Sequence, residues 1–424
     1  MSLPPRSRYT LLIPTYNRSA LLRSLLGYLA ARRFEYPIRI LDSSYEQALS
    51  ENRQTIERAG LDITHQVYDP AVPVGTKFAL GAQSVETPYC SFCADDDILF
   101  TGHLGRALDL LDADHSAAGA HGHYVNFKHN DNFDISDLLY WAPSIAGDDA
   151  LKRIVEQMGN YQAIFYAIYR TSVLQSKLQQ AKRGKSNLAI ELLMSAAALA
   201  AGGVHRLPHF HMARNTGPSM VSEGWHPYQF LASNPELLFS EYAEYRAIVL
   251  EHLLADERCR EVYTPAQMER VLDLVHLKYL APMISGPVLD RLIEESLGPD
   301  GQSQAISPGA WKKFTISDRK PEGLKGLLVH LRRALSEPHR AGMLLSYLRR
   351  LAGLRIAFKF GENLEASMGR RLGDMVIDRE TRDGRRRRYL LSREFLNQDI
   401  GDGRRVPAAA IRSMIEQLDD YVPS

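Results

Sequence analysis

The first half of the sequence predicts an α/β fold in which helices flank a mostly parallel sheet, and the second half predicts a mainly α-helical region. Two observations support the α/β prediction. Short apolar runs alternate with amphipathic segments up to about residue 93, and polar residues follow directly after each apolar run. Ligands bind at the carboxyl ends of the strands in such sheets, so we expect the functional residues immediately after the strands.

The expected elements of the sheet follow one another from residue 9 to residue 93. Each predicted strand is a short apolar run, and the first of these runs ends at Pro14. Each predicted helix is a longer amphipathic or polar segment between two such runs. The strands are expected at 9–13, 38–41, 63–67 and 88–93, and the helices between them at 19–32, 46–59 and 77–84.

The alternation loosens after Phe127, where polar, aromatic, Pro and Gly residues are mixed. This composition predicts a long loop over 128–149, of the kind that often shapes a substrate site. Regular patterns return with the apolar stretch 163–169, helices from Ser172 and over 188–200, and a strand over 204–212. We therefore expect the first domain to extend to residue 225.

The remainder of the chain predicts two further regions, a helical extension over 226–300 and a basic, mainly helical region over 301–424. Residues 319–360 contain ten Lys or Arg and two Glu. Apolar segments rich in arginine are typical of helices on an anionic membrane, and also of domain helices whose arginines reach solvent. We expect these regions to cover the acceptor side, to form a homo-oligomer, or to contact a membrane through 319–360. Asp383-Gly384 predicts a hairpin or loop.

Overall composition excludes several protein classes. Of the 424 residues, 45% are hydrophobic and 24% are charged, which is typical of a globular chain and not of a disordered one. The 51 Lys and Arg balance the 50 Asp and Glu, so no global positive field favours nucleic acid as a partner. Three cysteines suit a reducing compartment, and no segment predicts a signal peptide or a membrane span. We expect a cytoplasmic protein that is either soluble or peripheral on the cytoplasmic face of a membrane.

The acidic segment Asp95-Asp96-Asp97 directly follows the fourth predicted strand. Three adjacent carboxylates repel one another and need a counter-charge, which Mg²⁺ or Mn²⁺ bridged to phosphate oxygens would supply. A polar loop that caps the next helix from Thr101 is an alternative explanation. A phosphatase with an aspartate nucleophile is disfavoured, because Leu99 departs from the pattern of those enzymes.

Four short motifs stand at the ends of the predicted strands. They are IPTYNR over 13–18, Asp42 followed by two serines, Gly75-Thr76-Lys77, and the acidic segment 95–97. Together and in this order they resemble the family 2 glycosyltransferases of GT-A fold, over roughly residues 9–215. The resemblance implies an enzyme that depends on a nucleotide sugar and carries a DxD-type acidic loop.

The resemblance also implies roles for individual residues. In that family the segment after the first strand lines the nucleotide base, and the aspartate after the second strand reads the base. A basic residue further along reaches the base or the pyrophosphate, and the acidic loop holds the donor sugar and a metal ion. The implied donor-binding residues are Pro14, Thr15, Tyr16, Arg18, Asp42, Lys77, Asp95 and Asp96, and the implied ligand of Mn²⁺ or Mg²⁺ is Asp97.

Two downstream segments complete the implied site. The family supplies a catalytic base from a helix, and Glu191 is the sole acid in the otherwise apolar segment 187–193. An isolated acid in such a segment is a poor core residue, which favours a functional role. His209 and His211 would share one face of a strand and are candidate metal ligands, because a histidine completes the metal site of some GT-A enzymes.

We therefore expect a metal-dependent, inverting glycosyltransferase that moves a sugar from a nucleoside diphosphate sugar to a hydroxyl group. A UDP-sugar is the favoured donor, and the acceptor is a glycan, a lipid or a protein. Inversion is expected because a single displacement needs only one base. Two alternatives are a nucleotidyltransferase, which would attack the α-phosphorus and release pyrophosphate, and a glycan-binding or scaffold protein without catalytic activity.

Overall fold

A computed structural model describes most of the first 280 residues and parts of the remainder. The described residues are 7–129, 133–139, 143–159, 161–216, 235–280, 293–294, 296–298, 357–359, 374–381, 384–398, 400 and 405–423. Of the basic segment 319–360, the structure describes only 357–359. The predicted membrane contact therefore stays a prediction. Among the described helices, none is long and apolar enough to cross a bilayer.

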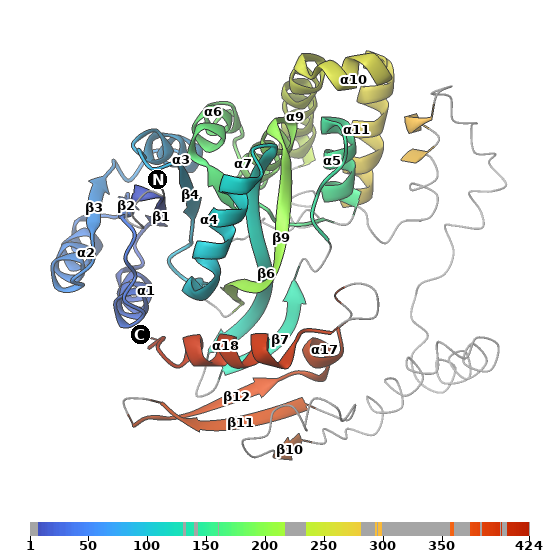
Figure 1. The fold of residues 1–424 in the computed structure, drawn as a ribbon. Coiled ribbons are helices and arrows are strands. Elements are labelled where there is room, and N and C mark those ends of the chain that lie inside the picture. Colours follow the sequence, from blue (N-terminus) through green and yellow to red (C-terminus); the bar gives the residue numbers. More distant parts are fainter. Residues whose placement is uncertain are drawn as a thin grey trace, which may run out of the picture.

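The α/β class and the predicted order of elements up to residue 92 are confirmed (Figure 1). Four neighbouring strands lie parallel in the order β4-β1-β2-β3, and a helix connects each one to the next in sequence. This arrangement brings the carboxyl ends of β1 and β4 together at one edge of the sheet. The strands are β1 (Tyr9–Thr15), β2 (Ile38–Asp42), β3 (Ile63–Val67) and β4 (Tyr89–Phe92), and the helices are α1 (Ser19–Ala31), α2 (Glu46–Arg58) and α3 (Val74–Gln83).

The sheet continues beyond β4 in mixed orientation, through strands separated by α4 (Leu104–Ala113) and later helices. The first of them, β8, is antiparallel to both β4 and β6, while β9 runs parallel to β6. A short strand after the acidic loop pairs antiparallel with β9 and so ties the loop to the sheet. These strands are β5 (Ile98–Leu99), β6 (Ala117–His129), β7 (Phe133–Leu139), β8 (Ile168–Arg170) and β9 (Gly203–Asn215).

The long loop predicted over 128–149 is wrong in part, because β7 occupies its centre and pairs antiparallel with β6. Phe133 and Ile135 are buried, whereas Asp134 and Ser136 between and beside them are more exposed. This period-two pattern is that of a strand with one buried face. The strand β7 is short and polar residues flank it, so its sequence resembles that of a loop.

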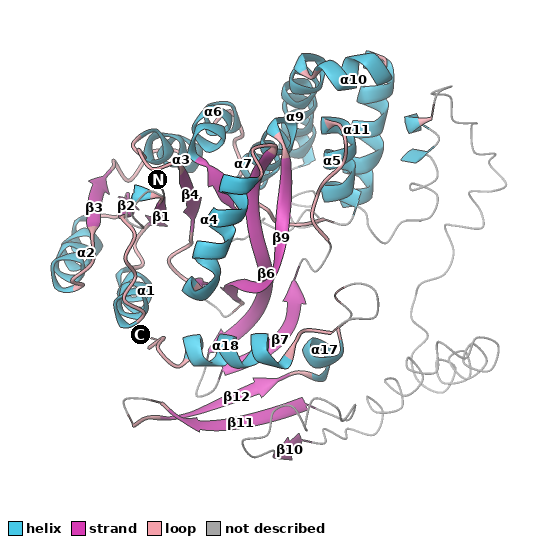
Figure 2. Ribbon diagram, in the orientation of Figure 1, coloured by secondary structure: helices cyan, strands magenta, loops and turns pink. Residues whose placement is uncertain are grey.

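Helices cover both faces of the sheet (Figure 2). Two clusters of buried hydrophobic side chains fill the space between the helices and the sheet. In β1, Leu11 and Ile13 belong to one cluster and Leu12 to the other, as expected when alternate side chains point to opposite faces. Within the predicted helical extension, the described residues 235–280 form helices that pack beside α5 and α7. The helices that pack around the cluster of Leu12 include α5 (Ala150–Gly159), α6 (Thr171–Ala181), α7 (Asn187–Ala201), α9 (Pro235–Ala255), α10 (Glu257–Val262) and α11 (Pro265–Leu280).

The described residues after 357 differ from the mainly helical region that the sequence predicted. They form three strands that extend the same sheet in the order β10-β11-β12-β7, and two helices that pack on it. In β12 only Tyr389 and Leu391 are buried, so three consecutive arginines hide the strand pattern in the sequence. The predicted hairpin is confirmed by the antiparallel pairing of the strands on either side of Gly384, whereas Asp383 lies outside the described residues. The elements are β10 (Ala357–Lys359), β11 (Asp374–Glu380), β12 (Arg386–Leu391), α17 (Arg393–Asn397) and α18 (Ala408–Leu418).

Candidate functional site

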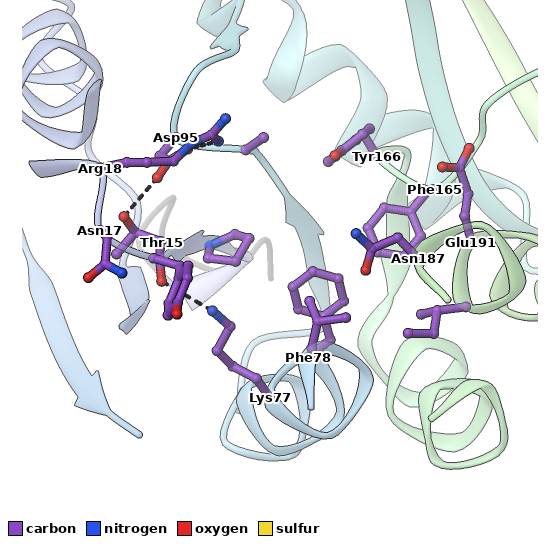
Figure 3. Close-up of a pocket in the computed structure, with 15 residues that line it drawn as sticks. Thr15, Asn17, Arg18, Lys77, Phe78, Asp95, Phe165, Tyr166, Asn187 and Glu191 are labelled. Carbon is purple, nitrogen blue, oxygen red and sulfur yellow. Dashed lines mark hydrogen bonds and ion pairs between the residues drawn. The ribbon is translucent and has the colours of Figure 1, made fainter. Parts of the chain in front are cut away.

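A cavity of about 600 Å³ lies at the carboxyl ends of β1 and β4 (Figure 3). One wall is the loop that follows β1 together with the start of the acidic loop, and the opposite wall is the first two turns of α7. The first residues of α3 lie between these walls. The lining residues are Pro14, Thr15, Tyr16, Asn17, Arg18, Val74, Lys77, Phe78, Ala94, Asp95, Phe165, Tyr166, Asn187, Ile190 and Glu191.

The loop after β1 is bound to the acidic loop by direct polar contacts. The Thr15 hydroxyl donates to Oδ2 of Asp95 over 2.7 Å. The Arg18 guanidinium bridges two carboxylates, with Nη1 at 2.8 Å from Oδ1 of Asp95 and Nη2 at 2.9 Å from Oδ2 of Asp96. Asn17 has a positive φ of 56° and its backbone N–H donates to Ser44, which fixes the turn that aims Arg18 at the carboxylates.

Burial disfavours the negative charge of the carboxyl groups in the acidic loop. Desolvation is the main cause that raises the pKa of Asp95 to about 6, although Arg18 opposes it. Desolvation also raises the pKa of Asp97 to about 7 against the opposing charge of Arg214. The Asp97 carboxylate accepts a hydrogen bond from the backbone N–H of Asn215 over 3.0 Å, and the Nε of Arg214 lies 3.7 Å away. The loop is therefore only partly compensated by the cations of the described chain.

Lys77 projects from the first turn of α3 onto the cavity floor, as predicted. Its ammonium donates to the Thr15 carbonyl over 3.1 Å and to the Ser43 hydroxyl over 2.8 Å. Burial lowers the pKa of Lys77 to about 8, while the negative charges of Asp42 and Asp95 oppose that change. The group is placed to donate to an anionic or carbonyl oxygen of a ligand in the cavity.

Asp42 is not among the residues that line the cavity, and its predicted contact with the base stays a prediction. Its side chain is fully buried, and its oxygens accept from Nδ2 of Asn52 over 2.8 Å, from Nε2 of His65 over 3.0 Å and from the Ser44 N–H over 2.9 Å. Burial alone would raise the pKa of this carboxyl, but the hydrogen bonds outweigh burial and lower it to about 2. In this structure the Asp42 carboxylate organises the loop that holds Lys77.

Glu191 lies on the α7 wall and lines the cavity, and its predicted role as the catalytic base stays a prediction. In Figure 3 it stands across the cavity from Arg18 and Asp95. The side chain is 5% exposed, and its Oε1 accepts a hydrogen bond from the Tyr161 hydroxyl. Burial raises the pKa of Glu191, and the hydrogen bond from Tyr161 and the charge of Arg214 partly offset that rise.

The rings of His211 and His209 contact protein groups in this structure, and their predicted role as metal ligands stays a prediction. His211 is fully buried; its Nε2–H donates to the Tyr166 carbonyl over 2.8 Å, so its Nδ1 accepts from Nε2 of His103 at the same distance. His209 is 2.7 Å from Nη1 of Arg106, which donates to it. Both rings are therefore engaged with protein groups and do not present a lone pair to the cavity.

The acidic loop retains the chemistry of a divalent cation site. The described residues contain no group of three or more His, Cys, Asp or Glu side chains arranged around one point. Mg²⁺, however, is commonly held by one or two carboxylates and takes its other ligands from water and substrate phosphates. Asp97 with its raised pKa, and the hard oxygens of Asp95 beside the cavity, fit a cation of that kind.

Seven of the predicted residues line one cavity. Asp96 is not among them, but it forms an ion pair with Arg18, which lines the cavity. The aromatic residues Phe78, Phe165 and Tyr166 also line the cavity, and no motif in the sequence marks them as site residues. Phe78 and Phe165 belong to a cluster with Phe92, with ring centroids 4.9–5.6 Å apart. No spacing in the sequence distinguishes these rings from ordinary core residues.

Comparisons with known proteins give similarity in outline only. No family model matches the chain, and no curated protein matches it. Among solved structures, S. aureus TarS 1–349 is 15% identical over 71% of this chain and 94% of that chain, with a TM-score of 0.38. Its complex with UDP-GlcNAc is 16% identical over 68% and 91%, with a TM-score of 0.39. The mannosyltransferase PcManGT from Pyrobaculum calidifontis, in complex with GDP-Man and Mn²⁺, is 14% identical over 81% and 85%, with a TM-score of 0.39. At these values the likeness carries no assignment of function.

Proposed function

We propose that this protein is a glycosyltransferase that binds a nucleoside diphosphate sugar in the cavity of about 600 Å³ and transfers the sugar to a hydroxyl group. The observation that carries the proposal is the composition of this one cavity. It combines a cationic and acidic wall around Arg18 and Asp95 with an isolated buried acid, Glu191, on the opposite wall. A diphosphate and an acceptor hydroxyl need these two kinds of group.

The diphosphate end of the donor would lie against the loop after β1. Lys77 has hydrogen atoms to donate to phosphate or base oxygens, and its two present acceptors are exchangeable neutral oxygens. Mn²⁺ or Mg²⁺ held through Asp97 would neutralise charge on the departing diphosphate. The favoured donor is a UDP-sugar, and Tyr16 lines the cavity with 44% exposure, as a stacking partner for a base requires.

Glu191 would take the acceptor proton on the other side of the cavity. The acceptor oxygen then bonds to the anomeric carbon as the bond between that carbon and the diphosphate oxygen breaks, so the products are a glycoside and a nucleoside diphosphate. One displacement inverts the anomeric configuration. A carboxylate whose pKa is raised by burial is a stronger base than an exposed one, and this favours the role.

Product analysis without an acceptor tests this proposal, because water can replace the acceptor hydroxyl. UDP-GlcNAc, UDP-glucose, UDP-galactose and GDP-mannose are each incubated with the protein and Mn²⁺, and the products are separated by chromatography. We expect a nucleoside diphosphate and free sugar from one donor, and about a hundredfold less from Glu191→Gln. The matched control is Glu244→Gln, since Glu244 lies on α9 with a 39% exposed side chain.

Other products would contradict the proposal. Release of pyrophosphate or a nucleoside monophosphate would indicate nucleotidyl transfer or attack at phosphorus. Equal turnover by the wild type and Glu191→Gln would remove the base from the account. Binding of glycans without turnover of any donor would favour the non-catalytic alternative.

A further inference from the structure

Glu191 has one hydrogen-bond partner within the described part of the chain, the hydroxyl of Tyr161. That residue follows α5, and its hydroxyl donates to Oε1, which leaves Oε2 for the cavity that Glu191 lines. A carboxylate with one oxygen held in this way keeps the other in a defined direction. Tyr161 itself is absent from the cavity lining and therefore acts through Glu191.

The other titratable groups around Glu191 do not hold it directly. Arg214 on β9 affects its charge, but the guanidinium lies 5.6 Å from the centroid of the Tyr166 ring and pairs with Asp97. Burial raises the pKa of the Tyr166 and Tyr169 phenols well above the ordinary value, and the negative charge of Glu191 raises it further. Tyr161 is thus the group whose contact sets the direction of the Glu191 carboxylate.

The helical extension braces Tyr161. The Tyr161 ring packs on Tyr279 in the last turn of α11, with centroids 4.7 Å apart and an interplanar angle of 47°. Tyr279 continues a row of rings through His276 at 6.2 Å, and His276 stacks on Tyr242 of α9 at 4.2 Å. Rigid aromatic contacts of this kind restrict the positions open to the Tyr161 hydroxyl.

We propose that Tyr161, braced by Tyr279, is a positioning residue that holds the Glu191 carboxylate toward the acceptor hydroxyl. The inference rests on the proposed function, because it assigns a role relative to the base. It also gives the helical extension a task, since α9 and α11 then contribute to the active site without touching a substrate.

Donor hydrolysis measured against pH in Tyr161→Phe tests the inference, because the substitution keeps the ring and removes only the hydroxyl. Loss of a donor to the carboxylate raises the pKa of Glu191, so the acidic limb of the kcat profile should move up by about one pH unit. At neutral pH kcat should fall about tenfold while the KM for the donor stays unchanged. Tyr279→Leu, which keeps the hydroxyl but removes the brace, should lower kcat with the same KM.

Tyr263→Phe is the matched control. The Tyr263 hydroxyl donates to Asp149 over 3.2 Å, so this variant also deletes a buried tyrosine–carboxylate contact, but one between α5 and the α10–α11 connection. Its kcat and pH profile should equal those of the wild type.

The outcomes separate this inference from the proposed function. If the wild type hydrolyses a donor and Tyr161→Phe has the same kcat and the same acidic limb, the positioning role is wrong and the proposed function stands. If the wild type hydrolyses none of the four donors, the proposed function fails and the positioning role fails with it. A fall in kcat for Tyr263→Phe equal to that for Tyr161→Phe would show a general packing effect and would also overturn the inference.

Discussion

Arg18 carries the counter-charge for two adjacent carboxylates of the acidic loop, Asp95 and Asp96. Its side chain is 29% exposed, whereas Asp95 is 2% exposed, so water cannot replace the guanidinium equally at both ends. Removal of one partner from such a pair leaves a buried charge that no other group compensates. The contact therefore stabilises the fold as well as the candidate site.

Arg18→Ala should lower the free energy of unfolding by about 2 kcal/mol at pH 8, less than for a fully buried pair because Arg18 is partly exposed. The loss should shrink as the pH falls toward 5. Without Arg18 the pKa of Asp95 rises above its present value of about 6, and protonation then removes the unpaired charge. Urea denaturation at several pH values measures this, with Arg23→Ala on the exposed face of α1 as the control. A loss that is independent of pH would contradict the account.

A second residue-level feature is the group of buried histidines between β6 and β9. Burial holds the pKa of His121 well below its ordinary value, and it lowers the pKa of His211 to about 4 and that of His123 to about 3. The unfolded chain binds protons at these positions below about pH 6.5, and the folded chain does so only at lower pH. Their contribution to stability is therefore present above pH 6.5 and is lost as the pH falls below it.

His121→Phe should remove part of this acid sensitivity. Neither ring nitrogen of His121 has a hydrogen-bond partner within the described part of the chain, so an apolar ring of similar shape relieves two unsatisfied buried groups. We expect the free energy of unfolding of the variant to exceed that of the wild type by about 1 kcal/mol at pH 5 and by less at pH 8. The control is His115→Phe at an exposed position. Equal pH dependence in His121→Phe and the wild type would contradict this interpretation.

Residue types at strand ends predicted one half of the site well. The loop after β1, Lys77 and Asp95 meet in one cavity because parallel strands end at the same edge of the sheet, whereas Glu191 reaches the cavity from α7. The partners of each side chain could not be predicted in the same way. His211 is a predicted metal ligand because a histidine completes the metal site of some GT-A enzymes, but the sequence does not reveal that His103 and the Tyr166 carbonyl contact its ring nitrogens.

At the scale of elements, the placement of α7 decides where Glu191 lies. The helix begins at Asn187, and Glu241 of α9 fixes the residues just before it. Its carboxylate accepts from the backbone N–H groups of Lys185 and Ser186, each over 2.6 Å, and from the Ser186 hydroxyl over 2.5 Å. The negative charge near the amino end of α7 also suits the helix dipole.

Glu241→Ala should therefore destabilise the start of α7. Three hydrogen bonds to a charged group are lost from a site where Glu241 is 7% exposed, and we expect the free energy of unfolding to fall by about 3 kcal/mol. Thermal unfolding measures the change. Glu244→Ala, one turn further along α9, loses an ion pair with Arg183 at a partly exposed position and should change stability by less than about 0.5 kcal/mol. Similar losses in the two variants would refute a specific anchoring role for Glu241.

Elements with a strong repeated pattern were predicted from sequence, whereas short ones were not. The first four strands are buried runs between amphipathic helices, and this alternation allows few folds. Strand β12 has two buried residues, Tyr389 and Leu391. The arginines before them are exposed or half-buried, and Arg388 forms an ion pair with Asp378 of β11. One partner of β12, the strand β11, precedes it directly in a hairpin. The other partner, β7, lies about 250 residues earlier in the sequence, and no local pattern encodes that pairing.

At the scale of the whole molecule, the carboxyl-terminal segment belongs to the core of the first half. Figure 1 shows α18 lying across the sheet and the chain ending near α1. Asp420 pairs with Arg32 over 2.9 Å, and the Gln417 side chain accepts from the Gly102 N–H over 3.2 Å, just beyond the acidic loop. Residues separated by more than 300 positions therefore support one end of the candidate site.

Because of this shared core, α18 and α1 should unfold together. Leu418 is fully buried in the cluster that α1 helps to form, and Leu418→Ala should cost about 3 kcal/mol. Native-state hydrogen exchange should show the same decrease in opening free energy for amides of α18 and α1. Leu277→Ala, at a half-exposed position on α11, should leave both unchanged. Early exchange of α18 alone would indicate that it is an independent unit.

The central claim is that the cavity binds a nucleoside diphosphate together with a divalent cation. Thermal unfolding with UDP, GDP, CMP or ADP, each with and without Mn²⁺, tests it in the wild type, Asp97→Ala and Lys77→Met. One nucleoside diphosphate with Mn²⁺ should stabilise the wild type, by about 2.7 kcal/mol at a hundred times its dissociation constant, and should stabilise both variants much less. Absence of stabilisation by every nucleotide, or equal stabilisation of all three proteins, would contradict the account.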